Sequence, residues 1–342
     1  MKFHIRTPCG SLCDVDIADS ATFSSLTEQV RDKTGIDSSF QLERDGHRVL
    51  LSGKDSVQHS NLRSGDVLDV VVQPLSCRKP IILFYLPRTG PFARVPTINV
   101  TVNVTLHPSC HFTMIIPRPE VAPDGHSLTW KAGIHRRKAL ADADEATIAR
   151  DDSSAMVCVN GHDRSYLFWE FETAKPPLPA VEAVMGYRSL LDHAEDAYLM
   201  TSESEYEEWC QGILELFGLG VVERDDFVTF WAGNVVEAGA VVVARIIPMT
   251  ELATVTELKV KATTEDAEGE KEVPVSVKRV FVTMVACSRL PKELEAVKDQ
   301  LRRWKAGTTM ADVPEELQKD FPIVKDPGSM SVLEWGGMLL YR

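Results

Sequence analysis

The stretch DRSYLFWEFET, residues 163–173, places an acid, Glu170, inside the most aromatic run of the chain. Successive side chains of an extended strand point to opposite faces, so Glu170 would share one face with Tyr166 and Phe168. Large aromatic side chains are rarely left facing bulk water. We therefore expect a strand that is covered on both faces, with Glu170 at least half buried. The other face would consist of Leu167, Trp169 and Phe171.

Strand patterns extend outward from this stretch. IILFYLP, residues 81–87, is a continuous apolar run, which is typical of a strand buried on both faces. INVTVNVTL, residues 98–106, alternates apolar residues with asparagine and threonine, which predicts an antiparallel strand with one buried face. Past the KPPLP segment, strands alternate with helices, and Ser202 or Ser204 can cap the helix that ends near Phe217. We expect an α+β body, resembling a β-sandwich, with added helices.

Residues 1–74 have a different pattern. MKFHIRT and CDVDI alternate and predict a hairpin, and TFSSLTEQVRDKTG predicts a helix with Thr22 as its N-cap. Two short strands around Asp45-Gly46 and a last strand in GDVLDVVV complete the order β-β-α-β-β-β. This order, with RDKTGI closing the helix, resembles ubiquitin. The resemblance implies a β-grasp fold for this part of the chain.

The resemblance also implies a docking surface. Ubiquitin contacts most of its receptors through an apolar patch on its sheet, and the matching positions here are Pro8, Glu43 and Val71. A carboxylate at the centre of that patch should weaken docking to ordinary receptors, because an unpaired charge is costly to bury. The chain continues instead of ending in the two glycines that serve conjugation. We expect this domain to dock a protein partner or to cap the next domain, and not to act as a modifier.

The rest of the chain, roughly residues 79–342, resembles a family of uncharacterised bacterial and fungal proteins. The motifs that support the resemblance are KPIILFYLP (79–87), SYLFWE (165–170), FVTFW (227–231), VKRVFVTM (277–284) and LEWGG (333–337). Two positions differ from the family pattern: Ala232 replaces a proline and Phe171 replaces a glycine. That family has no established activity, so the resemblance implies a fold and no function.

Composition limits the classes of partner. A net charge of −13 argues against nucleic acid or an anionic membrane as the main partner. No apolar run approaches the roughly 20 residues that span a bilayer, and the N-terminus lacks the apolar core of a signal peptide. Seven scattered cysteines are typical of free thiols in a reducing compartment. We expect the protein in the cytoplasm or the nucleus.

The domain organisation follows from these patterns. We expect the ubiquitin-like domain over residues 1–74 and a linker over 75–80. A β-rich section over 81–175 and a helix-plus-strand section over 176–342 would pack together as one body. No motif for a nucleotide, a metal or a serine nucleophile is present, so we expect no cofactor and no metal. The donors of HPSCH, namely His107, Cys110 and His111, have no second ligand cluster nearby and indicate an ordinary loop.

Two acids are adjacent to tryptophans, Glu170 in WE and Glu334 in EW. A carboxylate among aromatics can act as a general acid, anchor a ligand, or pair with an arginine such as Arg245 or Arg279 in a structural network. Free carboxylates facing one cleft would favour hydrolysis, whereas carboxylates bonded to arginine or backbone would favour a structural role.

We expect a binding or adaptor protein whose N-terminal domain docks a protein while the body holds an unknown ligand or protein in an aromatic groove. The alternative is a hydrolase with Glu170 and Glu334 as catalytic residues. The expected groove residues are Tyr166, Phe168, Trp169, Trp231 and Trp335. For Trp231, which lies at helical spacing with other aromatics, packing in a core is the default interpretation.

Overall fold

The computed structural model divides the chain into two compact units, Met1–Pro74 and Leu75–Arg342. Each unit has a mixed α+β fold. Strand β6 (Ser76–Tyr85) covers most of the segment expected to be a linker, because Leu75 and Cys77 are already buried in the core of the second unit. The structure describes residues 1–8, 10–34, 36, 40–49, 55–59, 62–72, 75–121, 125–137, 147–148, 154–174, 177–238, 241–266, 269–287, 289–305, 307–321 and 327–341.

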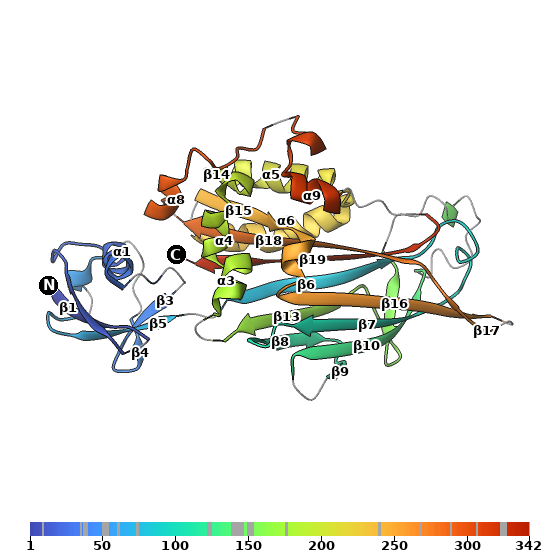
Figure 1. Cartoon of the computed structure of the whole chain (residues 1–342), viewed down its shortest axis with the longest axis horizontal. Coiled ribbons are helices and arrows are strands. Elements are labelled where there is room, and N and C mark those ends of the chain that lie inside the picture. Colours follow the sequence, from blue (N-terminus) through green and yellow to red (C-terminus); the bar gives the residue numbers. More distant parts are fainter. Residues whose placement is uncertain are drawn as a thin grey trace. The chain divides into compact units, whose positions relative to one another are not determined.

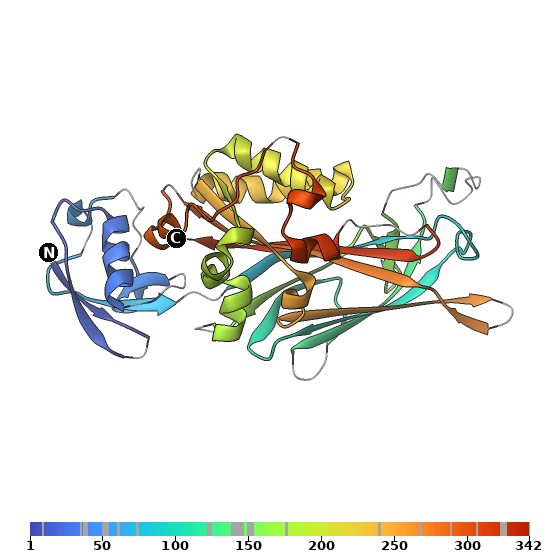
Figure 2. The same cartoon turned by 45° about the horizontal axis from the view of Figure 1, so that its top comes forward.

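The first unit is a mixed sheet with one helix, α1 (Phe23–Thr34), across one face (Figure 2). The strand order is β2-β1-β5-β3-β4, and β1 pairs with β5 in parallel. Thr22 caps the helix as predicted, since its Oγ1 accepts a hydrogen bond from the Ser25 backbone N–H. The strands are β1 (Lys2–Arg6), β2 (Leu12–Asp16), β3 (Phe40–Arg44), β4 (His47–Arg48) and β5 (Val67–Val72), with a short 3-10 helix η1 (Val57–His59) before β5.

The second unit contains two seven-stranded sheets. Sheet one has the order β14-β15-β18-β19-β6-β13-β8, in which only β18 and β19 pair in parallel among the described strands. The four central strands carry four of the five motifs on which the family resemblance rests. The new strands are β14 (Tyr198–Met200), β15 (Val241–Ile247), β18 (Val275–Cys287), β19 (Met330–Tyr341), β13 (Leu167–Thr173) and β8 (Cys110–Ile116).

Sheet two has the order β12-β11-β10-β7-β16-β17, and β9 also pairs with β10. The alternation predicted for 98–106 is confirmed, because β7 (Ile98–Leu106) buries every apolar residue of the pattern. Strands from the sections 81–175 and 176–342 occur in both sheets, so the two sections form one interleaved body. The other strands are β9 (Glu120–Val121), β10 (Ser127–His135), β11 (Met156–Val159), β12 (His162–Arg164), β16 (Thr256–Asp266) and β17 (Gly269–Glu272).

Sheet one is covered differently on its two faces (Figure 1). Its inner face packs on sheet two and on the helices α3 and α4, and its outer face packs under α5 and α6. Ser202 caps α5, accepting from the Glu205 backbone N–H. Within the described residues, no helix is long and apolar enough to cross a membrane. The helices are α3 (Pro179–Met185), α4 (Tyr187–Asp192), η3 (Ala194–Asp196), α5 (Glu203–Leu216), α6 (Val221–Ala238), α7 (Met249–Leu252), α8 (Lys292–Ala296), η4 (Met310–Asp312) and α9 (Glu315–Asp320).

Candidate functional site

The motifs meet at a buried polar cluster centred on Glu334. Arg279 Nε donates to Glu334 Oε2 at 2.5 Å, and Trp169 Nε1 donates to Glu334 Oε1 at 2.9 Å. Arg279 Nη1 donates to the backbone carbonyl of Thr256 at 2.5 Å, and Thr256 belongs to sheet two. Glu334 is fully buried. The cluster therefore joins three strands of sheet one to the opposite sheet, and Glu334 offers no free carboxylate.

The two glycines that follow Trp335 allow a close approach of neighbouring elements. A Cβ on Gly337 would lie 2.8 Å from the Val282 carbonyl oxygen and 2.9 Å from the Trp231 ring. A Cβ on Gly336 would lie 3.0 Å from the Cα of Pro80. Real Cβ atoms do not show the contacts that Gly337 would make, and those of Gly336 would be unusually tight, so packing of α6 and β6 on β19 explains the WGG motif.

Three of the residues expected to line a groove are in the cores instead. Trp169 packs in the inner core, and Trp231 and Trp335 pack in the outer core beside Phe227. Each of the three tryptophans has no exposed surface. Their indole rings fill the layers on either side of sheet one, which leaves them no surface for a ligand.

The outer face of sheet one is exposed at its β13–β8 end. Phe168 lies opposite Ile116, and Glu170 lies opposite Met114. Met114 and Ile116 are each 47% exposed and Tyr166 is 39% exposed, whereas Phe168 is partly buried against the outer core. We call this surface the open face and define it by Tyr166, Phe168, Glu170, Met114 and Ile116. The open face includes two of the predicted groove residues, Tyr166 and Phe168. They are less covered than we expected for two aromatic side chains on one face of a strand.

Glu170 is half-buried in the open face. Its Oε1 accepts a hydrogen bond of 3.2 Å from the Lys79 backbone N–H, and its Oε2 has no partner among the described residues. The arginines expected to pair with it bond elsewhere, Arg279 with Glu334 and Arg245 with Glu251. Glu170 is thus anchored through one oxygen, and the other can meet a ligand.

A bulge in β6 positions the donor to Glu170. Lys79 has a φ of 52°, a left-handed conformation that is uncommon outside glycine, and the β13–β6 register shifts at this point. The Lys79 ammonium lies 4.6 Å from the centroid of Phe230 and 5.2 Å from that of Trp335. Burial lowers the pKa of Lys79, and the nearby charge of Asp226 opposes that change. The bulge therefore directs the Lys79 backbone N–H toward Glu170, and it directs the Lys79 ammonium group toward the rings of Phe230 on α6 and Trp335 on β19.

Glu170 and Glu334 project from opposite faces of the same sheet. Glu334 bonds to Trp169, which belongs to the inner core, and to Arg279, which reaches sheet two. Glu170 is adjacent to Phe168, which packs against the outer core, and bonds to a backbone N–H. The two carboxylates do not face one cleft, which was the condition set for a hydrolase.

The expected docking positions of the first unit lie on a polar surface. Pro8 is exposed, and Glu43 and Val71 are half-buried. Glu43 Oε1 accepts from Gln41 Nε2 at 2.6 Å, and Glu43 pairs across the sheet with Asp69. The sheet face away from α1 is therefore charged around Glu43, and no continuous apolar patch surrounds it among the described residues.

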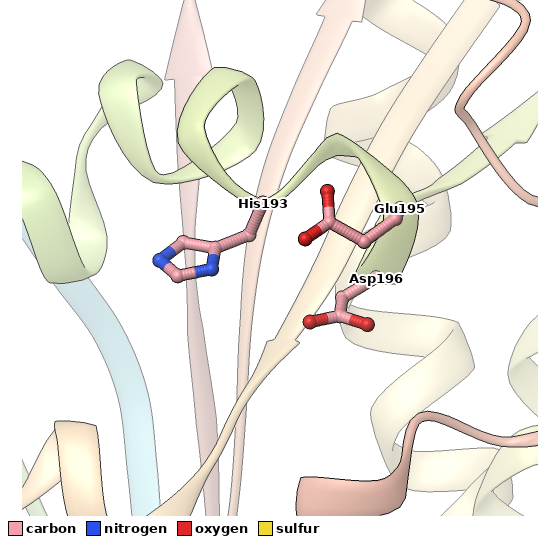
Figure 3. A group of neighbouring side chains, drawn as sticks. All are labelled: His193, Glu195 and Asp196. Carbon is pink, nitrogen blue, oxygen red and sulfur yellow. The ribbon is translucent and has the colours of Figure 1, made fainter.

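One group of side chains has metal-ligand chemistry. Ligand atoms of His193, which follows α4, and of Glu195 and Asp196 in η3 all lie within 4.8 Å of one another (Figure 3). Burial raises the pKa of Asp196, and the positive charges of Arg245 and Arg302 counter this. Two guanidinium groups already supply positive charge, so the group by itself is weak evidence for a cation. Sequence analysis missed it because the three residues lie in one short turn without a ligand-spacing pattern.

The donors of HPSCH do not converge. His107 Nδ1 is 2.8 Å from Ser109 Oγ, Cys110 is buried in the inner core, and His111 is exposed. Cys110 and His111 begin β8, so only the first part of the segment is the loop that the sequence predicts.

No protein-family model matches the chain, and no curated protein is similar enough to it to be identified as a relative. The resemblances to ubiquitin and to the bacterial and fungal family therefore stay predictions. The site rests on geometry alone. Sequence analysis did not select Lys79, Met114 and Ile116, although HFTMIIPRP continues the strand pattern with apolar residues that fall on both faces of β8.

Proposed function

We propose that this chain is a binding protein of the cytoplasm or nucleus, with two separate contact surfaces. The first unit is a ubiquitin-like domain that docks a protein partner. The β2-β1-β5-β3-β4 order, the parallel β1–β5 pair and the position of α1 across one face support this proposal, since a β-grasp domain has the same arrangement. The second unit binds its own ligand or protein on the open face.

One observation supports the role of the second unit above all. Three large apolar side chains are exposed at this end of the sheet: Met114 opposite Glu170, Ile116 opposite Phe168, and Tyr166 just before β13. Among the described residues, Glu170 has one carboxylate oxygen without a partner. Exposed apolar residues gathered around a polar group are typical of interaction surfaces, whereas single exposed apolar residues need no explanation. Binding supplies the cover that neither α5 nor α6 gives to these side chains.

A hydrolase is the weaker candidate. Its proposed acid pair is split between the two faces of sheet one, and Glu334 is bonded to both Arg279 and Trp169. Glu170 alone could still act as an acid or base. A single carboxylate beside exposed aliphatic side chains is, however, better suited to anchor a cationic or hydrogen-bonding group than to perform two-carboxylate hydrolysis.

The test is photocrosslinking in the full-length chain. A benzophenone amino acid at Met114 should form an adduct with one defined partner in extracts of the cells that make the protein. The same group at Lys259, an exposed position on sheet two, is the matched control. An adduct pattern at Met114 that is the same as at Lys259 would show that the open face is not a binding surface.

A further inference from the structure

We propose that the open face binds an extended basic segment of a partner protein, which adds to sheet one as a new strand beside β8. This inference rests on the proposed function and names its partner class. The segment would place an apolar side chain next to Ile116, and basic side chains two and four positions further along, opposite Glu170 and Glu172.

The edge of the sheet is available for such pairing. Strand β8 ends the strand order of sheet one and pairs only with β13 among the described strands. Within the described residues, the backbone of 111–116 makes no hydrogen bond outside that sheet. Natural edge strands are usually blocked by charged residues, proline or a covering loop. Strand β8 has no Lys, Arg, Asp, Glu or Pro, and its one register shift against β13 lies between Phe112 and Met114, so the Met114–Ile116 part is a regular edge that can accept an added strand.

The outer face sets the side-chain pattern of the added strand. Phe168, Glu170 and Glu172 alternate along β13 and lie opposite Ile116, Met114 and His111 of β8. Side chains of an added strand that point to this face repeat every second residue. The row of acids at Glu170 and Glu172 therefore selects two cationic side chains, and the Phe168–Ile116 end selects an apolar one.

An arginine or lysine can reach Glu170 from the added strand. The distance is two strand spacings, about 10 Å, which two long side chains can share. The aliphatic stem would lie over the exposed Met114, and the charged end would meet the free Oε2 of Glu170. Glu172 is held by Ser76 Oγ at 2.8 Å, which orients its carboxylate on the same face.

Charge distinguishes this partner from a second copy of the chain. The chain has a net charge of −13, which attracts a basic segment and opposes association of two identical chains. Pairing of β8 with another β8 would also bring two sets of Glu170 and Glu172 to one face. A basic partner avoids both the repulsion between two acidic chains and the repulsion between two sets of carboxylates on one face.

The proposal is tested with a short fluorescein-labelled peptide in which isoleucine, arginine and arginine alternate with threonine. We expect its fluorescence anisotropy to rise on titration with the full-length protein. Glu170→Gln should weaken binding about tenfold, as expected for the loss of one charge-assisted hydrogen bond. Glu272→Gln, on the β17 edge of sheet two, is the matched control and should change nothing. A peptide with glutamate in place of arginine should not bind.

Strand addition is separated from simple charge attraction by the peptide backbone. N-methylation of alternate residues removes the hydrogen bonds of one peptide edge and leaves its charge intact. One of the two alternate methylation patterns should abolish binding while the other leaves it unchanged. Equal loss or no loss with both patterns would overturn the strand-addition model.

Three other results would also overturn the proposal: no binding of the arginine peptide, equal binding by the Glu170→Gln variant, or a dimer in sedimentation that a Met114→Lys change dissociates. If the peptide fails while the Met114 crosslink succeeds, the open face binds something else and only this inference is lost. If both fail, the proposed function of the second unit is lost as well.

Discussion

Glu334 and Glu170 lie on the two strands that flank β6, yet their surroundings are opposite. Glu334, on β19, points to the inner face and is fully buried between Arg279 and Trp169. Glu170, on β13, points to the outer face and has one backbone partner and one free oxygen among the described residues. Both acids are adjacent to a tryptophan in the sequence. The face of the sheet to which the acid points, and not the adjacent tryptophan, decides which acid is structural and which can contact a ligand.

The difference has a physical cause. An ionised carboxylate loses its hydration in a sealed core, so it persists there only with a cation or several donors. Glu334 has a guanidinium and an indole N–H for this purpose. Glu170 keeps contact with water, so one backbone donor is enough. The comparison can be tested by substitutions on each face.

The largest effect is expected for Glu334→Gln. Removal of the negative charge leaves Arg279 buried without compensation, which should destabilise the second unit by about 3–5 kcal/mol. Urea unfolding followed by tryptophan fluorescence measures this directly, because all six tryptophans lie in Leu75–Arg342. Replacement of both Glu334 and Arg279 by methionine should cost less than the single change. A loss below about 1 kcal/mol for Glu334→Gln would contradict the buried-pair interpretation.

Trp169→Phe should have the second largest effect. It removes the indole donor to Glu334 and part of a fully buried ring, and a hydrogen bond to a charged group contributes about 1.5–3 kcal/mol. Phe168→Leu, on the outer face of the same strand, is the control and should cost less, since Phe168 is only partly buried. A larger loss at Phe168 than at Trp169 would reverse the assignment of the two faces.

The local features of the fold could be predicted from the sequence. The alternation in 98–106 gives β7 its buried face, and Thr22 and Ser202 cap their helices, because each depends on neighbours in the chain. The strand over 167–173 was also predictable. Its covered face was not, because both faces carry apolar side chains and the main packing partners of α6 are β18 and β19.

The candidate site was only half predictable for the same reason. Glu170, Tyr166 and Phe168 follow from one stretch of sequence. The sheet order that puts β8 beside β13, the bulge at Lys79 and the separation of Glu170 from Glu334 are all results of long-range pairing. Core packing was the default expected for Trp231 at its helical spacing, and the structure confirms it, whereas the placement of Trp335 in a groove was wrong because its covering layer comes from distant segments.

A third acid, Glu43, extends the comparison to the first unit. Glu43 is half-buried, bonds to Gln41 and lies opposite Asp69. A receptor that covers this face must desolvate the acid, so Glu43→Ile should tighten binding of a synthetic ubiquitin-receptor helix by about 1 kcal/mol, or roughly fivefold. Calorimetry with the full-length chain measures the change. Glu28→Ile, on the exposed side of α1, is the control, and an equal gain there would show that added hydrophobicity alone explains the result.

The smallest effect on stability is expected for Glu170→Gln, the outer counterpart of Glu334→Gln. The substitution keeps the side-chain shape and an oxygen that can accept from the Lys79 N–H, and no buried cation loses its partner. Surface changes of this kind usually shift the free energy of unfolding by no more than about 0.5 kcal/mol. The same urea experiment should therefore barely distinguish this variant from the natural chain, while the Met114 crosslink and peptide binding weaken. A destabilisation comparable to that of Glu334→Gln, with binding intact, would mean that both acids are structural and that the open face needs no carboxylate.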